Sequence, residues 1–231
     1  MIFDRKVIKG ESIEVEQLNV TANGTYTASE GHAYSPVTVN VPTVNLSTFE
    51  YALQYEDNGL TAHFYGKSAS NFSYNNIVTK TIIEDSITTL NQFPYYCTAI
   101  ATVEGGASVE IITANSFRGC SSLSTLNFPK LRQLTGTAGF QFGQMTALTS
   151  ATLGSVGYGL ETIQSSACFD QDTRADLVIT IYCTGANADT LLSKIRAGAT
   201  NATIYVKASE NTVYGGVDYN AGDTMITSEV L

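Results

Sequence analysis

Two histidines are the residues of this chain that could act as general bases. A catalytic triad requires a nucleophile, a base and an orienting acid close in space, and His32 and His63 are the only histidines in the sequence. His32 lies in a Glu-Gly-His turn, and His63 lies in an alternating Thr-Ala-His-Phe-Tyr segment. We interpret both as solvated turn or strand positions, and we expect neither to be catalytic.

Pairs of carboxylates could instead hydrolyse sugars. The candidates are Glu84 with Asp85, Asp170 with Asp172, and Asp176. The two pairs lie beside Ser or Thr, and all five residues lie in turn-like contexts without the aromatic platform of a glycan cleft. The pattern favours solvated turn residues. We therefore expect a protein without enzymatic activity, with a glycan hydrolase as the weaker alternative.

Metal and cofactor sites are not predicted. The cysteines form no Cys-x-x-Cys pair, so we expect buried free thiols rather than a zinc site; they are Cys97, Cys120, Cys168 and Cys183. Residues 218–223 resemble half of a calcium loop but lack the later bidentate Glu, which favours a surface turn. Three glycine-rich segments lack the spacing of a phosphate loop and are interpreted as turns; they are residues 105–106, 136–139 and 154–157.

The composition indicates a globular chain with few charges. Charged residues make up 14% of the 231 residues, below the ~25% of a typical soluble domain, and Thr, Ser, Asn, Gly and Tyr supply the polar character. The formal net charge of -9 would repel a phosphate backbone, which argues against nucleic acid as a partner. No stretch reaches the ~20 apolar residues of a spanning helix, and charges interrupt the N-terminus where a secretory signal would be apolar. We therefore expect no membrane insertion and no export signal within this sequence; a signal peptide that has been removed is the alternative.

Before residue 77 the sequence predicts small β-elements. Residues 1–17 mix charged and apolar residues, which suggests an arm or an edge strand. Leu18 and Val20 alternate, as do Val37, Val39 and Val41, so we expect half-buried strands with a tight turn at Asn23-Gly24. Residues 1–46 then form an N-terminal arm and β-hairpin attachment module. Residues 47–76 form a β-rich connector or cap, with two strands flanking a turn at residues 57–59.

From about residue 77 the sequence repeats. Phe142 follows Phe117 at the same interval at which Met145 follows Cys120. A third copy contains Phe169, and a degenerate earlier copy contains Ile87, Leu90, Tyr96 and Ile100. The period drifts between about 25 and about 29 residues, which suits a solenoid in which insertions occupy loops. The predicted repeat core consists of Phe117, Cys120, Leu123, Leu126, Phe142, Met145, Leu148, Phe169, Leu177 and Ile179.

The predicted fold class is mainly β, a short solenoid that follows a small β-module and contains one short C-terminal helix. A single unit cannot bury its own apolar side, so Phe117 should lie over Phe142 and Phe142 over Phe169. The solenoid is expected over residues 77–206, with a C-terminal cap or tail over residues 207–231. Residues 189–197 have helical spacing, with Asp189 as N-cap and Gly198 as stop, and residues 202–206 indicate a final strand.

The pattern Ala-x-x-Phe-x-x-Cys-x-x-Leu-x-x-Leu-x-x-Pro resembles the BspA-type leucine-rich repeats of bacterial surface proteins. It is clearest in Phe117, Cys120, Leu123, Leu126 and Pro129. The ending at residues 202–207 also looks like the "IYVP" closure of that family, with Lys in place of Pro. The resemblance covers about residues 86–207. It implies a leucine-rich-repeat solenoid and a protein that binds rather than catalyses.

A second resemblance lies upstream. Residues 19–28, together with residues 34–41, look like a segment of tail and baseplate virion proteins from phages of Firmicutes. It implies a phage virion protein whose N-terminal region contacts other virion proteins and whose solenoid binds a host-surface polysaccharide or protein. The alternative is a secreted bacterial cell-surface adhesin. A homo-oligomer is a further alternative, although no heptad run predicts a coiled coil.

No binding surface can be assigned from the sequence alone, but tyrosines are the best candidates for one. Tyrosine combines apolar area with a hydroxyl and few rotamers, which suits a binding face. Core packing explains about half of them equally well. The candidates include Tyr51, Tyr55, Tyr65, Tyr74, Tyr95 and Tyr96.

Overall fold

The chain forms two compact units, Met1–Asn45 and Leu46–Leu231. The structure is a computed structural model, and it describes residues 2–9, 12–19, 24–26, 37–39, 52–70, 72–169 and 174–228. Of the residues before 53, only the backbone is described. His32, Tyr51, Asp170 and Asp172 lie outside the described residues.

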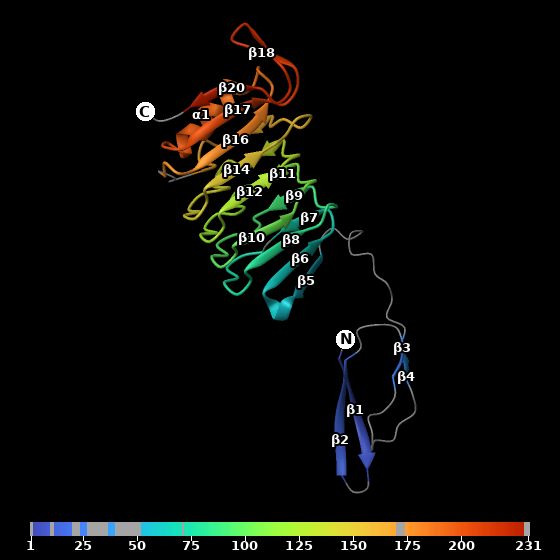
Figure 1. Cartoon of the computed structure of the whole chain (residues 1–231). Coiled ribbons are helices and arrows are strands. Elements are labelled where there is room, and N and C mark those ends of the chain that lie inside the picture. Colours follow the sequence, from blue (N-terminus) through green and yellow to red (C-terminus); the bar gives the residue numbers. More distant parts are fainter. Residues whose placement is uncertain are drawn as a thin grey trace. The chain divides into compact units, whose positions relative to one another are not determined.

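The first unit contains two antiparallel strand pairs (Figure 1). β1 (Ile2–Lys9) pairs with β2 (Ser12–Asn19) along its whole length. β3 (Gly24–Tyr26) pairs with β4 (Val37–Val39). The expected arm or edge strand over residues 1–17 is therefore a complete two-stranded ladder, because its alternating residues allow both segments to extend. Gly24 begins a strand instead of forming a turn.

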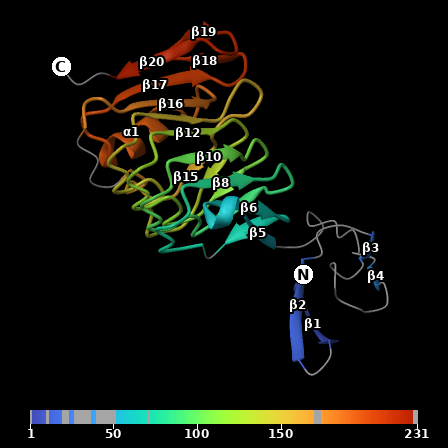
Figure 2. The ribbon, with the colours of Figure 1, turned by 60° about the horizontal axis from the view of Figure 1, so that its bottom comes forward.

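The second unit is a solenoid whose coils each pass through two parallel ladders and a third, turn-rich side (Figures 1 and 2). The first ladder contains β6 (Thr61–Tyr65), β8 (Lys80–Ile83), β10 (Thr102–Gly105), β12 (Thr125–Phe128), β14 (Ser150–Leu153), β16 (Val178–Cys183) and β17 (Thr203–Ala208). The second ladder contains β7 (Ser68–Ser70), β9 (Thr89–Asn91), β11 (Ile111–Ile112), β13 (Gln133–Leu134) and β15 (Thr162–Ile163). Residues between the second and the first ladder form the turn-rich side.

Coil length varies more than the sequence pattern predicts. In the first coils, Thr61 pairs with Lys80 and Lys80 pairs with Thr102, so each coil contains only about 20 residues. Later in the chain, Ser150 pairs with Val178, which closes a distinctly longer coil. The expected range of about 25 to about 29 residues is therefore too narrow. The parallel ladders also begin at Thr61, before residue 77, so residues assigned to a connector already form a coil.

The core is built from rows of apolar side chains that continue from coil to coil. In the first ladder, Leu126 pairs with Ala151 and Ala151 pairs with Ile179, and all three are buried. The inward positions alternate with exposed ones, as half-buried strands require. The ten residues of the predicted repeat core are all at most 3% exposed.

Phenylalanines form a continuous column through the solenoid. The ring centroids of Phe117 and Phe142 are 6.2 Å apart, and those of Phe142 and Phe169 are 5.0 Å apart. The column extends upstream through Phe93, 6.5 Å from Phe117, and Phe64, 4.3 Å from Phe93. Offset and edge-to-face arrangements of this kind stabilise aromatic pairs beyond their area burial. Each coil therefore covers the apolar ring of its neighbour.

The one α-helix of the described residues lies in the last complete coil. α1 (Ala188–Gly198) takes the place of the second strand and the turns, and it buries Leu191 and Ile195. Its N-cap is Asn187 rather than the predicted Asp189. Asp189 lies in the first turn instead, where a negative charge is favourable beside the helix N-terminus. The predicted stop, Gly198, is the last helical residue.

Antiparallel strands cover both ends of the solenoid. β5 (Ala52–Glu56) pairs with β6 across a single 3-10 turn, and β20 (Thr224–Ser228) pairs with β17. Between β17 and β20 the chain forms a hairpin of β18 (Thr212–Tyr214) and β19 (Val217–Tyr219). Arg196 links α1 to β20, because its guanidinium donates to the carbonyl oxygens of Ala202 at 2.7 Å and of Ser228 at 2.6 Å.

Candidate functional site

His63 is held between two carboxylates rather than exposed to solvent. Its Nδ1 lies 2.8 Å from Glu56 Oε1, and its Nε2 lies 2.6 Å from Glu84 Oε1. The Tyr65 hydroxyl is 2.9 Å from Nδ1, and burial, followed by the charges of Glu56 and Glu84, raises the pKa of Tyr65. The side chain of His63 is only 14% exposed, so the expectation of a solvated position is wrong. With both ring nitrogens engaged, His63 connects β5, β6 and the end of β8.

The other acid–base candidates do not assemble a site in the described residues. Glu84 is engaged by His63, whereas Asp85 and Asp176 are exposed and separate. Asp218 and Asp223 are also exposed, and the carboxylate of Asp223 accepts from the backbone N–H of Asn220 at 2.8 Å within its own turn. Among the described residues, no three His, Cys, Asp or Glu side chains come together in a way that could hold a metal ion.

The cysteines are buried free thiols. Burial raises the pKa of Cys120 and of Cys168 to about 12. Such thiols remain protonated at neutral pH and pack as small apolar groups. Neither of them therefore offers a nucleophile.

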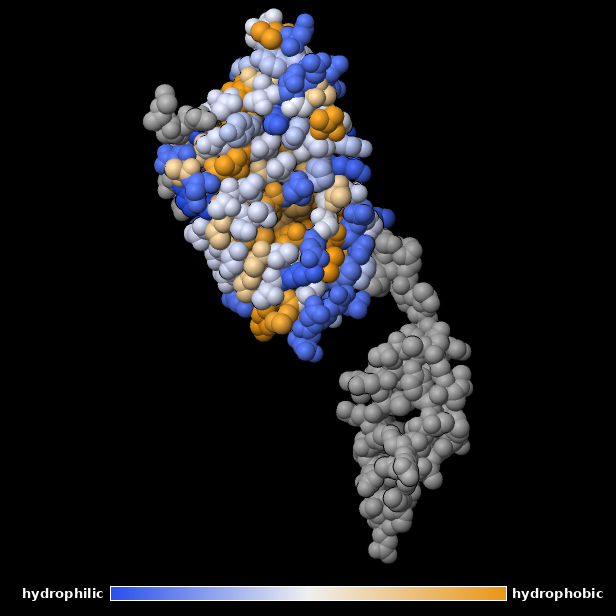
Figure 3. Space-filling view, in the orientation of Figure 1, coloured by the Kyte–Doolittle hydropathy of each residue, from blue (hydrophilic) through white to orange (hydrophobic). Residues whose placement is uncertain are grey.

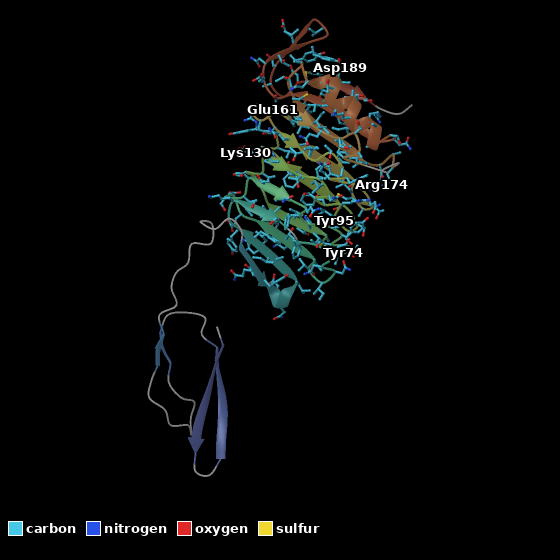
Figure 4. The ribbon with its side chains drawn as sticks, turned by 180° about the vertical axis from the view of Figure 1, so that it is seen from behind. Tyr74, Tyr95, Lys130, Glu161, Arg174 and Asp189 are labelled. Atoms are coloured by element: carbon cyan, nitrogen blue, oxygen red, sulfur yellow. The ribbon has the colours of Figure 1, made fainter. Side chains whose placement is uncertain are left out.

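Aromatic side chains do gather, on the turn-rich side of the solenoid. We call the group Tyr74, Tyr95, Tyr96, Arg118 and Phe140 the aromatic strip. Figure 4 shows Tyr74 and Tyr95 near one another along one edge of the solenoid, with Lys130 and Glu161 along the opposite edge. Each coil from the first to the fourth contributes at least one residue to the strip.

Backbone hydrogen bonds between successive coils position the strip. The N–H of Tyr74 donates to the carbonyl of Tyr95 at 2.8 Å, and the N–H of Tyr96 donates to the carbonyl of Arg118 at 2.7 Å. Tyr74, Tyr96 and Phe140 have left-handed backbones, with φ of 53°, 50° and 62°. This conformation is uncommon for bulky residues and costs energy. The turns therefore hold these side chains in a fixed direction despite that cost.

The rings of the strip contact one another. Tyr74 and Tyr96 are parallel within 3°, with ring centroids 5.7 Å apart, and Tyr95 packs edge-on against both, at 5.4 and 4.7 Å. Arg118 places its guanidinium 4.4 Å from the ring centroid of Phe140 and 5.8 Å from that of Tyr96. Cation–π contacts of this kind hold the guanidinium flat against the rings. The strip is therefore a connected surface rather than a set of separate side chains.

Hydrogen bonds fix the polar ends of the strip. The Tyr96 hydroxyl donates to Gln144 Oε1 at 2.6 Å. A hydrogen bond with Tyr74, together with burial, raises the pKa of Tyr95. Gly119 is required below the ring of Tyr96, because a Cβ at this position would lie 2.5 Å from that ring. Tyr74 is 66% exposed, so the strip is open to a ligand.

The sequence indicated three members of the strip and missed two. Tyr74, Tyr95 and Tyr96 were binding candidates, and the structure places them together. The sequence also places Tyr96 in a degenerate earlier copy of the repeat, but the buried ring of that coil is Phe93, and Tyr96 is partly exposed. Arg118 and Phe140 were not recognised, although a signal exists. Tyr74, Tyr96, Arg118 and Phe140 follow one another at equal intervals along the sequence.

The remaining tyrosine candidates lie elsewhere. Tyr55 is 52% exposed on β5, and Tyr65 stacks on His63 with ring centroids 4.2 Å apart.

No helix of the described residues is long and apolar enough to cross a membrane.

Comparison with known proteins identifies the repeats. The model of the BspA type leucine-rich repeat region matches residues 40–179 with six copies. A crystal structure of the leucine-rich repeat protein of T. pallidum matches with 16% identity and a TM-score of 0.39, over 57% of this chain and 68% of that one. The search of curated proteins gives no match. Because the family match spans more than half of the sequence, the chain belongs to the BspA-type leucine-rich repeat family.

Proposed function

We propose that this chain is a non-catalytic attachment protein whose aromatic strip binds a neutral polysaccharide on a bacterial host surface. The observation that carries the proposal is the connected row of one exposed ring, three partly exposed rings and one guanidinium on the turn-rich side. Membership of a family typical of surface and secreted proteins supports a role in attachment.

The strip has the chemistry that sugar recognition requires. The flat apolar faces of Tyr74 and Phe140 suit the apolar faces of sugar rings, and the hydroxyls and the guanidinium can donate hydrogen bonds to sugar oxygens. Left-handed turns hold the rings in place before the ligand arrives. A pre-organised surface loses less conformational entropy on binding. The low charge content of the chain also favours an uncharged ligand.

Substitution of Tyr74 tests this surface. We expect Tyr74→Ala to weaken adsorption of the purified chain to isolated host cell-wall polysaccharide about tenfold, the typical effect of removing a central aromatic contact. Tyr158→Ala is the matched control. Tyr158 is also exposed, at 42%, and also lies beside a cation, Lys130, which Figure 4 shows on the opposite edge. Equal binding of the polysaccharide by the two variants would exclude the strip as the binding site. Binding of the chain to a host protein but not to the polysaccharide would exclude the polysaccharide as the ligand.

The proposal also concerns whether the protein belongs to a phage particle or to a bacterial surface. We infer a phage virion component, because residues 19–41 resemble segments of phage tail and baseplate proteins. In this arrangement the first unit contacts other virion proteins and the solenoid contacts the host. The alternative is a bacterial surface adhesin, which the family membership also favours.

Immunogold labelling distinguishes these locations. With an antibody against the solenoid, we expect gold on the tails of purified particles and none on uninfected cells. Labelling of the surface of uninfected cells, with particles unlabelled, would instead establish the adhesin. The polysaccharide adsorption experiment is independent of this result, because it measures the strip and not its carrier.

A further inference from the structure

The first ladder of the solenoid is interrupted between β10 and β12. β10 is the last strand of the sheet β10-β8-β6-β5, and β12 is the first strand of the sheet β12-β14-β16-β17-β20. Although residues 102–128 are all described, no strand pairing or backbone hydrogen bond joins β10 to β12. The second ladder, in contrast, continues without a break from β7 to β15. Two edge strands therefore face one another within the solenoid.

The hydrogen bonds on the other side of each strand show which backbone groups face this gap. The N–H of Thr102 donates to the carbonyl of Thr79, just before β8, and the N–H of Gly106 donates to the carbonyl of Ile83 in β8. Because alternate residues of a parallel strand point to opposite neighbours, the peptide groups of Val103 face the gap.

On the other wall, the carbonyls of Ser124 and Phe128 accept from Ser150 and Gly154 in the next coil. By the same alternation, the peptide groups of Thr125 and Asn127 face the gap. The β12 wall therefore presents backbone donors and acceptors at the spacing of a β-strand, and the β10 wall presents the N–H and C=O of Val103.

A cavity of about 250 Å³ lies between these walls. Figure 3 shows a hollow with apolar side chains on this face of the solenoid, at the level of β10 and β12 in Figure 1. This volume is below the ~300–1,000 Å³ of small-molecule pockets, so a narrow occupant fits better. No lining residue is charged; they are Val103, Gly105, Thr125, Leu126, Asn127 and Phe128.

We propose that the gap binds an extended, uncharged peptide segment of a partner protein, which pairs with β10 and β12 as an added strand. An extended peptide is the ligand whose N–H and C=O groups alternate to both sides at this spacing. Leu126 and Phe128 close the floor of the gap and are only 3% and 1% exposed, so the added segment would be held through its backbone.

The β12 edge of the gap lacks the usual protection against such pairing. Exposed edge strands are commonly blocked by charges, prolines or bulges. β12 has the sequence Thr-Leu-Asn-Phe and contains none of these. The one charge of β10, Glu104, is 2.7 Å from Lys80 on the neighbouring β8. The gap lies on the first ladder and the aromatic strip on the turn-rich side, so this proposal does not depend on the polysaccharide proposal.

Peptide binding to the full chain tests the gap. The probe is a capped peptide with the sequence of residues 149–154, Thr-Ser-Ala-Thr-Leu-Gly, which forms a strand of this ladder in the next coil. We expect saturable binding by fluorescence polarisation, and at least tenfold weaker binding when every second peptide nitrogen is methylated. Methylation removes backbone donors and leaves the side chains unchanged. Equal binding of the methylated peptide, or no binding of the parent peptide at millimolar concentration, would overturn the proposal.

Variants of the chain locate the binding. Thr125→Pro removes a gap-facing N–H and leaves the pairing of β12 with β14 intact, so we expect at least tenfold weaker binding at an unchanged melting temperature. Thr125→Val keeps the N–H and should bind like the parent chain.

Hydrogen exchange examines the gap without relying on either variant. In the chain alone, the amides of Val103, Thr125 and Asn127 should exchange quickly, and added peptide should protect them. Protection of these three amides before peptide is added would mean that the gap is closed, and would refute the proposal.

Discussion

Phe142→Ala is expected to lower the free energy of unfolding of the solenoid by about 3–5 kcal/mol, the range found for buried phenylalanines. Phe142 is fully buried, and its ring lies between those of Phe117, at 6.2 Å, and Phe169, at 5.0 Å. Its removal leaves a cavity at the interfaces with the preceding coil and with the following coil. Because coils stabilise one another through nearest-neighbour interfaces, the loss affects both sides. Urea unfolding followed by far-ultraviolet circular dichroism measures it.

Two further variants are the controls for Phe142→Ala. Phe142→Leu keeps most of the apolar volume and should give a smaller loss, which keeps the measurement possible if the alanine variant does not fold. Tyr55→Ala removes an aromatic ring that is 52% exposed and should change the free energy of unfolding by less than about 0.5 kcal/mol. A cost below about 1 kcal/mol for Phe142→Ala, far under the usual range for a buried phenylalanine, would mean that the phenylalanines do not form a shared column.

The column could be predicted from the sequence where the coils are long. Phe142 follows Phe117, and Phe169 follows Phe142, at nearly the same interval, so a search at a single spacing finds them. Burial of large apolar side chains dominates the energy of a coil. Their periodicity is therefore the strongest signal that the sequence contains.

Phe93 lies 24 residues before Phe117, close to that spacing, but Phe64, 29 residues before Phe93, does not keep it. The first coils are shorter, because Thr61 pairs with Lys80 and Lys80 pairs with Thr102. An alignment at this shorter interval selects Tyr96, which lies 21 residues before Phe117, whereas the buried ring is Phe93, 24 residues before it. Hydrogen-bonded turns set coil length locally, and apolar periodicity contains no information about the length that a turn requires.

The candidate site shows a different limit of the sequence. Tyr74, Tyr96, Arg118 and Phe140 recur at equal intervals, but they include both aromatic and cationic types, so a search for one class of residue overlooks them. The gap between β10 and β12 is invisible for another reason. Strand pairing depends on backbone groups that all residues share, and the side chains of the two strands contain no signal for a missing ladder.

Raising the pH above about 9 is expected to destabilise the solenoid steeply. Burial raises the pKa of Cys120 and of Cys168 from the ordinary value near 9 to about 12. In the unfolded chain these thiols ionise from about pH 9, whereas in the folded chain they retain their protons up to about pH 12. Between these values the unfolded state releases protons that the folded state keeps, so the free energy of unfolding falls as the pH rises. Below about pH 8 these thiols contribute no pH dependence.

The expected slope is about 1.4 kcal/mol per pH unit for each thiol, or about 3 kcal/mol for the two together. Over about two pH units this approaches the total stability of a typical domain, about 5–15 kcal/mol. Urea unfolding between about pH 8 and pH 11 measures the slope, and the double variant Cys120→Ala, Cys168→Ala isolates the share of the two thiols. Cys97, Cys183, Tyr65 and Tyr95, whose pKa values are also raised, keep their contribution in that variant. An unchanged slope in the double variant would show that neither thiol is as deeply buried as the packing of the coils requires.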